Sequence, residues 1–171
     1  MDSDWMRGCK FSNSQDSQYD NALICKNGHV INSMSNQYPI DNKAFCEECG
    51  SKALDRCEKC NTLIRGNKLG DTYYLPSFCF NCGSVFPWTQ LKIETAIELG
   101  LSSELIDDNE RDILRTSIPE IIKDTPRTML ESTKVKKILW KIGNGTSTMI
   151  KETLAAIISE TAKKIIWPDK P

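Results

Sequence analysis

The stretch from Cys25 to Gly83 determines the fold, and it reads CKNGHVINSMSNQYPIDNKAFCEECGSKALDRCEKCNTLIRGNKLGDTYYLPSFCFNCG. It contains four close pairs of metal-binding residue types: Cys25 and His29, Cys46 and Cys49, Cys57 and Cys60, Cys79 and Cys82. Sixteen residues separate the first pair from the second, and eighteen separate the third from the fourth. Each gap is long enough for a hairpin that folds one pair back onto the next. Because structural zinc takes four Cys or His ligands as two such pairs, the sequence predicts two structural zinc ions.

The residues that follow the cysteine pairs support this prediction. Cys49 and Cys82 are each followed by glycine, and Cys60 is followed by asparagine. These residue types accept a positive φ, which lets backbone N–H groups point at a thiolate sulfur. The single histidine and seven of the eight cysteines complete two sets of four ligands. We expect the remaining Cys9 to be a free thiol rather than a replacement for His29.

Two pairings of the ligand pairs are open. Sequential pairing gives two zinc ribbons in tandem, whereas interleaved pairing gives a cross-brace of the RING type. The seven residues between Cys49 and Cys57 suit either arrangement. We favour the sequential one, because each consecutive set of four has the spacing of a ribbon by itself.

The compartment bears on how the cysteines are interpreted. The N-terminus lacks the basic and apolar regions of a signal peptide, and no apolar run approaches the roughly 20 residues needed to span a bilayer. We therefore expect a cytoplasmic protein that does not bind membranes. Thiols stay reduced there, which favours metal ligands over disulfides.

Composition divides the chain into three segments. Residues 1–20 form a polar arm that we expect to be weakly ordered, residues 21–88 a double zinc ribbon of short hairpins, and residues 89–171 a helical domain of about four to five helices. The predicted fold is therefore a small α+β protein, with tandem zinc ribbons and two structural zinc sites followed by an all-α region.

Several signals place the helices. Leu91, Ile93, Ala96 and Ile97 form the apolar stripe of a first helix that Gly100 ends, and a second helix is expected from Ser103 to about Arg115. The run Ser117-Ile118-Pro119-Glu120 has the pattern of a capping box that begins a third helix. Pro126 is expected at the start of the next helix, which Gly143 ends. One last helix is expected to carry Ile150 through Ile166.

Some of these motifs resemble a known family. Cys25-Lys26-Asn27-Gly28-His29-Val30, Ile64-Arg65-Gly66 and Phe86-Pro87-Trp88-Thr89 look like an uncharacterised bacterial family of small double-zinc-ribbon proteins with a helical tail. The resemblance covers roughly residues 22–166. It implies zinc ligands at the eight positions above and a bacterial source, and it implies no activity. Arg65-Gly66 and Trp88 are either functional residues or, respectively, turn and packing residues.

The function predicted from the sequence is non-enzymatic. Both ligand sets are complete, whereas a catalytic zinc keeps an open position, and no nucleophile elbow, P-loop or HExxH motif is present. We therefore predict no catalytic residues and no cofactor besides zinc. The favoured role is a zinc-stabilised adaptor module that binds a protein partner. The partner, the pathway and the oligomeric state stay open.

Two alternative functions are weighed against it. In a nucleic-acid-binding ribbon, exposed aromatic residues would stack on bases beside basic residues; the candidates are Tyr73, Tyr74, Phe78 and Phe80 with Lys59, Arg65 and Lys68. Residues 1–90, however, hold nine Lys or Arg against ten Asp or Glu, and two zinc ions with seven thiolates would lower the net charge from −1 to about −4. A RING-like ligase module is the minor alternative and requires the interleaved pairing.

Overall fold

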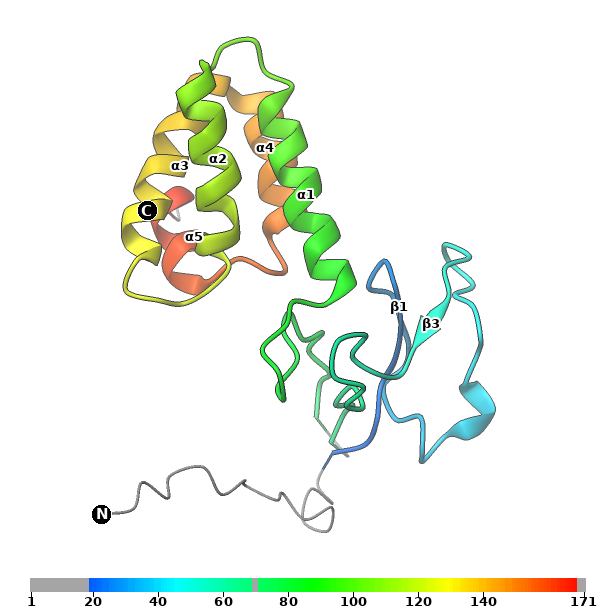
Figure 1. Cartoon of the computed structure of the whole chain (residues 1–171). Helices are drawn as coiled ribbons and strands as arrows, with labels where there is room; N and C mark the ends of the chain where they lie inside the picture. The colour runs from blue at the N-terminus through cyan, green and yellow to red at the C-terminus, as the bar shows by residue number, and fades with distance from the viewer. Residues whose placement is uncertain (1–18, 69–70, 169–171) are drawn as a thin grey trace, which may run out of the picture. The chain divides into compact units, whose positions relative to one another are not determined.

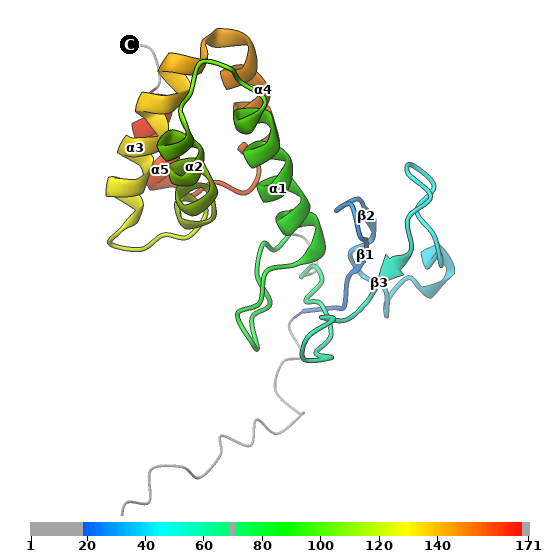
Figure 2. The same cartoon turned by 45° about the horizontal axis from the view of Figure 1, so that its top comes forward.

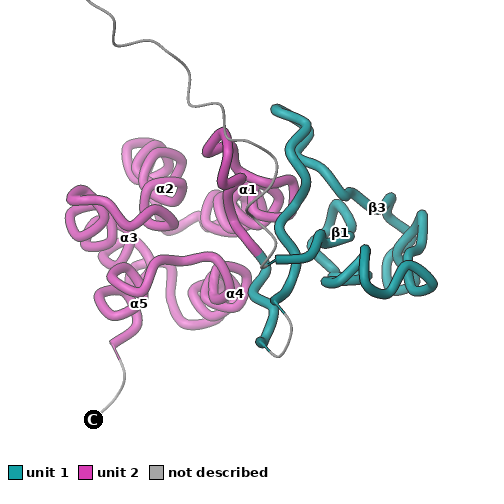
Figure 3. The backbone as a smooth tube through the Cα atoms, turned by 90° about the horizontal axis from the view of Figure 1, so that it is seen from below, with its two compact units in different colours: residues 1–75 teal, residues 76–171 magenta. Residues whose placement is uncertain are grey.

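The computed structural model describes residues 19–68 and 71–168, and the chain divides into two compact units, residues 1–75 and residues 76–171 (Figure 3). The predicted polar arm of residues 1–20, with Cys9, lies outside the described residues except for Tyr19 and Asp20.

The first unit contains a three-stranded antiparallel sheet in the order β2-β1-β3 (Figure 2). Its strands are β1 (Leu23–Cys25), β2 (Val30–Asn32) and β3 (Ala53–Leu54), and a short 3-10 helix, η1, covers Pro39–Asp41. Ile24, at the centre of the sheet, pairs with Val30 on one side and with Leu54 on the other. β1 and β2 form a hairpin whose turn requires Gly28, since φ is 91° there. The hairpin sets Cys25 and His29 on neighbouring strand ends.

Hydrogen bonds rather than apolar contacts hold much of this unit together. Apart from cysteines, the buried hydrophobic residues among its described residues are Ala22, Ile24 and Ile64. The Asp20 carboxylate accepts the backbone N–H groups of Asn36 and Gln37 at 3.0 Å. A core of this size cannot stabilise a domain alone, so the unit needs an additional source of folding energy.

The second unit contains the last cysteine pair and five α-helices within the described residues (Figure 1). They are α1 (Pro87–Leu101), α2 (Asp108–Ile121), α3 (Thr128–Ile142), α4 (Asn144–Leu154) and α5 (Glu160–Ile166). α3 packs against α2, α4 and α5, and α1 packs against α2 and α4. The helices enclose one aliphatic cluster, to which each of them contributes; examples are Ile93, Leu114, Leu139, Ile150 and Ile166. The predicted α+β fold, with a small sheet followed by a helical region, is confirmed.

The predicted capping box at Ser117 is wrong. α2 continues through Pro119 to Ile121, and the capping box lies at its true start, where Asp107 and Glu110 accept each other's backbone N–H. Ser117 is instead fully buried, and its hydroxyl donates to Oε2 of Glu131 at 2.7 Å. Burial of Ile118 and Ile121 offsets the one helical hydrogen bond that Pro119 removes. Tertiary packing therefore overrides a local start signal.

The other helix ends differ less from the prediction. α3 begins at Thr128, two residues after Pro126, and ends at Gly143, whose φ is 93°. The predicted last helix is two helices, because Ser159 caps α5 by accepting the N–H of Ala162. Trp88 has a packing role, since it is fully buried, stacks on Phe86, and donates from Nε1 to the Pro76 carbonyl at 2.8 Å.

Candidate metal centres

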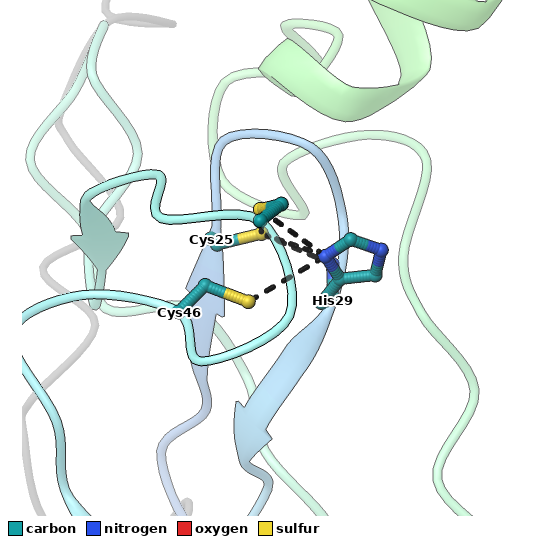
Figure 4. Close-up of side chains that lie close together, drawn as sticks. Cys25, His29 and Cys46 are labelled. Carbon is teal, nitrogen blue, oxygen red and sulfur yellow. Dashed lines mark hydrogen bonds between the residues drawn. The ribbon is translucent and has the colours of Figure 1, made fainter.

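The first group of metal-binding side chains consists of Cys25, His29, Cys46 and Cys49, and their ligand atoms all lie within 4.8 Å of one another. Cys25 ends β1 and His29 immediately precedes β2, so one hairpin supplies both. Figure 4 shows the Sγ atoms of Cys25 and Cys46 turned toward Nδ1 of His29. Two segments far apart in the sequence thus present four donor atoms to one point.

The distances between these atoms test whether a metal ion fits. Nδ1 of His29 lies 3.6, 3.5 and 3.3 Å from the sulfurs of Cys25, Cys46 and Cys49, and the sulfurs of Cys25 and Cys49 are 3.7 Å apart. A tetrahedral ion about 2.3 Å from sulfur and about 2.0 Å from nitrogen would set sulfurs about 3.8 Å apart and sulfur about 3.5 Å from nitrogen. These four distances therefore match those expected around one four-coordinate metal ion.

Neighbouring groups orient these donors. The backbone N–H of His29 donates to Sγ of Cys25 at 3.2 Å, which stabilises negative charge on that sulfur. The other ring nitrogen of His29, Nε2, lies 3.6 Å from a carboxylate oxygen of Glu48. A carboxylate on this side favours the tautomer that carries its proton on Nε2 and leaves Nδ1 available to a metal.

Cys49 and Cys25, the last and first ligands of this group in the sequence, differ in acidity. Hydrogen bonds from the backbone N–H and the hydroxyl of Ser51 lower the pKa of the exposed Cys49 thiol to about 6. Burial raises the pKa of Cys25, against the effect of the backbone N–H groups that point at it. Cys49 is thus the more acidic of the two thiols, and Cys25 would have to lose its proton to ligate a cation.

The same hydrogen-bonded turn, called the knuckle below, occurs at all three Cys-x2-Cys pairs. The residue after the second cysteine donates its N–H to the carbonyl of the first at 2.9 Å in each repeat. Its φ is positive each time, at 70° for Gly50, 60° for Asn61 and 68° for Gly83, as the sequence predicts. Isolated antiparallel bridges close the knuckles: Phe45 with Lys52, Arg56 with Leu63, and Phe78 with Val85.

A further regularity was missed in the sequence. Two residues after the second cysteine of each pair stands a hydroxyl residue: Ser51, Thr62 and Ser84. The hydroxyls of Thr62 and Ser84 lie 3.3 and 3.2 Å from Sγ of Cys60 and Cys82, where they can donate to a thiolate. The repeated pattern Cys-x2-Cys-(Gly/Asn)-(Ser/Thr) was the available signal, and it marks residues that support the metal ligands.

The second group consists of Cys57, Cys60, Cys79 and Cys82, whose sulfurs also lie within 4.8 Å of one another. The structure therefore gathers the four pairs sequentially, the first with the second and the third with the fourth. The interleaved cross-brace is not the arrangement found. Both groups offer four donors. The first group has three sulfurs and one nitrogen, and the second has four sulfurs.

Two of the residues predicted to stack on bases, Tyr73 and Phe78, have structural contacts instead. Tyr73 is half-buried, donates from its hydroxyl to the Arg65 carbonyl at 3.0 Å, and has a pKa that burial raises. Phe78 packs against the helical cluster. Tyr74 and Phe80 are exposed.

Arg65 and Gly66 also have structural roles. The Arg65 guanidinium lies over the ring of Tyr19, 4.7 Å from its centre. A side chain at Gly66 would collide with the backbone of Ser33 and of Asn21, and its N–H donates to the Asp20 carbonyl at 2.6 Å. The Ile64-Arg65-Gly66 motif therefore packs the start of the first unit onto its middle.

Comparison with known proteins identifies the family. Residues 18–166 match the model of the family described as "Uncharacterized protein conserved in bacteria (DUF2321)", and the chain belongs to this family. The resemblance noted in the sequence is thereby confirmed, and the family description includes no catalytic activity. Neither the curated proteins nor the solved structures gave a match. No helix in the described ranges has both the length and the apolar character required to cross a membrane.

Proposed function

We propose that this member of the bacterial family is a non-enzymatic adaptor, in which two structural zinc ions hold a surface that binds a protein partner. The observation that carries the proposal is the completeness of the two donor groups. Each supplies four Cys or His donors, so a bound ion has no open position for substrate or water. Thiolate and imidazole donors in a tetrahedron favour Zn²⁺ over Mg²⁺ or Ca²⁺, which prefer oxygen ligands.

The small core of the first unit supports a structural role for the metal. Its described residues bury three aliphatic side chains besides cysteines, which is too little for independent stability. A structural zinc site supplies about 10–16 kcal/mol of apparent binding energy in finger peptides, and that energy becomes folding energy. Bound zinc would therefore supply much of the folding energy of the first unit.

The surface of the first unit supports the binding role. Large apolar side chains stand exposed between the two ligand pairs of the first donor group in the sequence, with exposed fractions of 84% for Ile40, 61% for Phe45 and 42% for Val30. All three come from the 30–45 stretch, which links the two ligand pairs of that group. Apolar side chains gathered on one segment and rimmed by charges are typical of protein-binding surfaces.

The two alternatives receive less support. A nucleic-acid surface would need several phosphate contacts, yet the chain has a formal charge of −1 before any metal binds. Two of the four candidate stacking residues, Tyr73 and Phe78, are engaged in packing. The RING-like alternative required the interleaved grouping, whereas the pairs are grouped sequentially.

Photo-cross-linking in the bacterial host tests the proposal. A photoreactive amino acid replaces Ile40 in one strain and the exposed Glu152 of α4 in a control strain. We expect a discrete protein adduct from position 40 that is absent from position 152. An adduct made of nucleic acid, or the same adducts from both positions, would contradict the adaptor function.

A further inference from the structure

A groove of about 550 Å³ lies in the first unit beside the first donor group. One wall is formed by His29 and β2 with Ser33, and the other by residues of the 41–48 segment, among them Lys43 and Phe45. Cys46 and His29 line it too, so a metal bound by these residues would fix the distance between the walls. The groove is thus a feature that metal binding would hold open.

The wall formed by β2 is the edge of a sheet. β2 pairs with β1 on one side only, since the strand order is β2-β1-β3. Val30 lies opposite Ile24 on β1. The hydrogen bond between the strands lies at the next pair of residues, where the N–H of Cys25 donates to the His29 carbonyl at 3.0 Å. In an antiparallel ladder such alternation turns the N–H and C=O of Val30 away from β1, toward the open edge. An extended peptide can add to an edge of this kind.

The charge of the groove selects the occupant. Asp41, Glu47 and Glu48 line it against the single cation Lys43. Three thiolates around one Zn²⁺ would add a further negative charge. The exposed ring of Phe45 and the methyl groups of Val30 offer apolar contacts in the same groove. The complementary ligand is therefore extended, basic and apolar at alternate positions.

The chain's own N-terminal segment does not have this chemistry. Residues 1–18 carry three acidic residues, Asp2, Asp4 and Asp16, against the two basic residues Arg7 and Lys10. They lack an alternation of basic and aliphatic residues. Residues 1–18 are therefore not the complementary segment.

We propose that the groove binds an extended, lysine- or arginine-rich segment of the partner protein, which adds as a strand to the edge of β2. The basic side chains of this segment pair with Asp41 and Glu47, and its intervening aliphatic side chains contact Phe45 and Val30. This inference rests on the proposed adaptor function and names the chemistry of its partner.

Fluorescence anisotropy with the zinc-loaded full chain tests it. The probe is a dye-labelled ten-residue peptide in which lysine alternates with valine. One comparison peptide carries glutamate in place of lysine, and another carries proline in place of valine, which removes backbone N–H donors. We expect binding of the lysine–valine peptide alone. Equal binding of the glutamate or the proline peptide would overturn the proposal.

Charge reversal locates the binding on the protein. Asp41→Lys combined with Glu47→Lys should weaken binding of the lysine–valine peptide by about tenfold. The matched control combines Glu98→Lys and Glu152→Lys, two exposed helical positions, and should leave binding unchanged. If the Asp41→Lys, Glu47→Lys variant binds the peptide like the unmodified chain, the groove is not the binding site. If that variant does not fold, NMR of the unmodified chain locates the binding site instead. The amide signals of Val30 and Ile31 must then shift when the peptide is added.

The peptide-binding test and the cross-linking test distinguish a failure of this inference from a failure of the adaptor function. A protein adduct from position 40 that persists in the Asp41→Lys, Glu47→Lys variant would overturn the inference and leave the adaptor function standing. The absence of any protein adduct would count against the adaptor function itself.

Discussion

Asn61 is the one described residue outside glycine whose φ is positive, at 60°. Asparagine tolerates this region better than other side chains, and a β-branched residue tolerates it worst. We predict that Asn61→Val destabilises the zinc-loaded chain by about 1–2 kcal/mol, whereas Asn61→Gly leaves the stability within about 0.5 kcal/mol of the original. Thermal unfolding of the two variants checks this. Equal melting temperatures would contradict the proposed role of φ at the knuckle.

The hydroxyl residues that follow each knuckle give a second prediction at this scale. Thr62→Val keeps the shape of the side chain but removes the hydroxyl that lies 3.3 Å from Sγ of Cys60. Loss of a supporting hydrogen bond typically costs about 10–100-fold in metal affinity, and we expect the lower part of that range for one hydroxyl. Competition against a chromogenic chelator measures the change. Thr62→Ser, which retains the hydroxyl, is the control and should bind zinc like the original chain.

Among the helices, the contact between α2 and α3 depends on a buried carboxylate. Glu131 is 3% exposed and accepts hydrogen bonds from the Ser117 hydroxyl and from Nζ of Lys134. The first of these bonds, followed by the lysine, lowers the pKa of Glu131 below its ordinary value. Its ionised form is therefore stabilised by folding.

This pKa shift predicts how stability depends on pH. The contribution of Glu131 is complete above the pKa of the unfolded carboxyl, about 4.3, and is lost as the pH falls through the lower folded value. Glu131→Gln should cost about 1–2 kcal/mol at pH 7 and progressively less below about pH 4. Urea unfolding followed by helical circular dichroism measures both values. A cost that does not change with pH would show that the ionised carboxylate is not what stabilises the contact.

The helices also show what the sequence could and could not predict. The stripes of Ile93 and Ala96, or of Val135 and Ile138, were predictable because burial follows the helical period. The end of α3 at Gly143 was predictable from backbone sterics. The role of Ser117 was not, since Ser-x-x-Glu is the same local pattern whether the serine caps a helix or lies buried against Glu131. That partner is fourteen residues away, and only the packing of α2 on α3 brings the two together.

The candidate metal centres were more predictable than the groove beside them. Ligand spacing and the positive-φ residues are local constraints, and the chain must satisfy them wherever a knuckle forms. The Glu48 carboxylate near Nε2 of His29 was not predictable, because it depends on how the hairpin meets the 46–49 knuckle. The groove likewise depends on the distance between β2 and the 41–48 segment, for which no local pattern is diagnostic.

At the scale of the whole molecule, the two units should respond differently to metal removal. The second unit has its own aliphatic cluster, whereas the first buries few aliphatic side chains. We predict that excess chelator abolishes the dispersion of the amide NMR signals of residues 21–68 while most of the helical circular dichroism remains. Complete loss of the helical signal would show that the helices depend on metal for their own folding.

The number of zinc ions per chain tests the central claim most directly. Native mass spectrometry of protein purified without chelator should show two zinc ions, because the eight ligands form two complete groups of four. Cys25→Ser and Cys79→Ser should each retain one ion, since each removes a ligand from only one group. A count of one in the original chain, or the loss of both ions from either variant, would contradict two separate structural zinc sites.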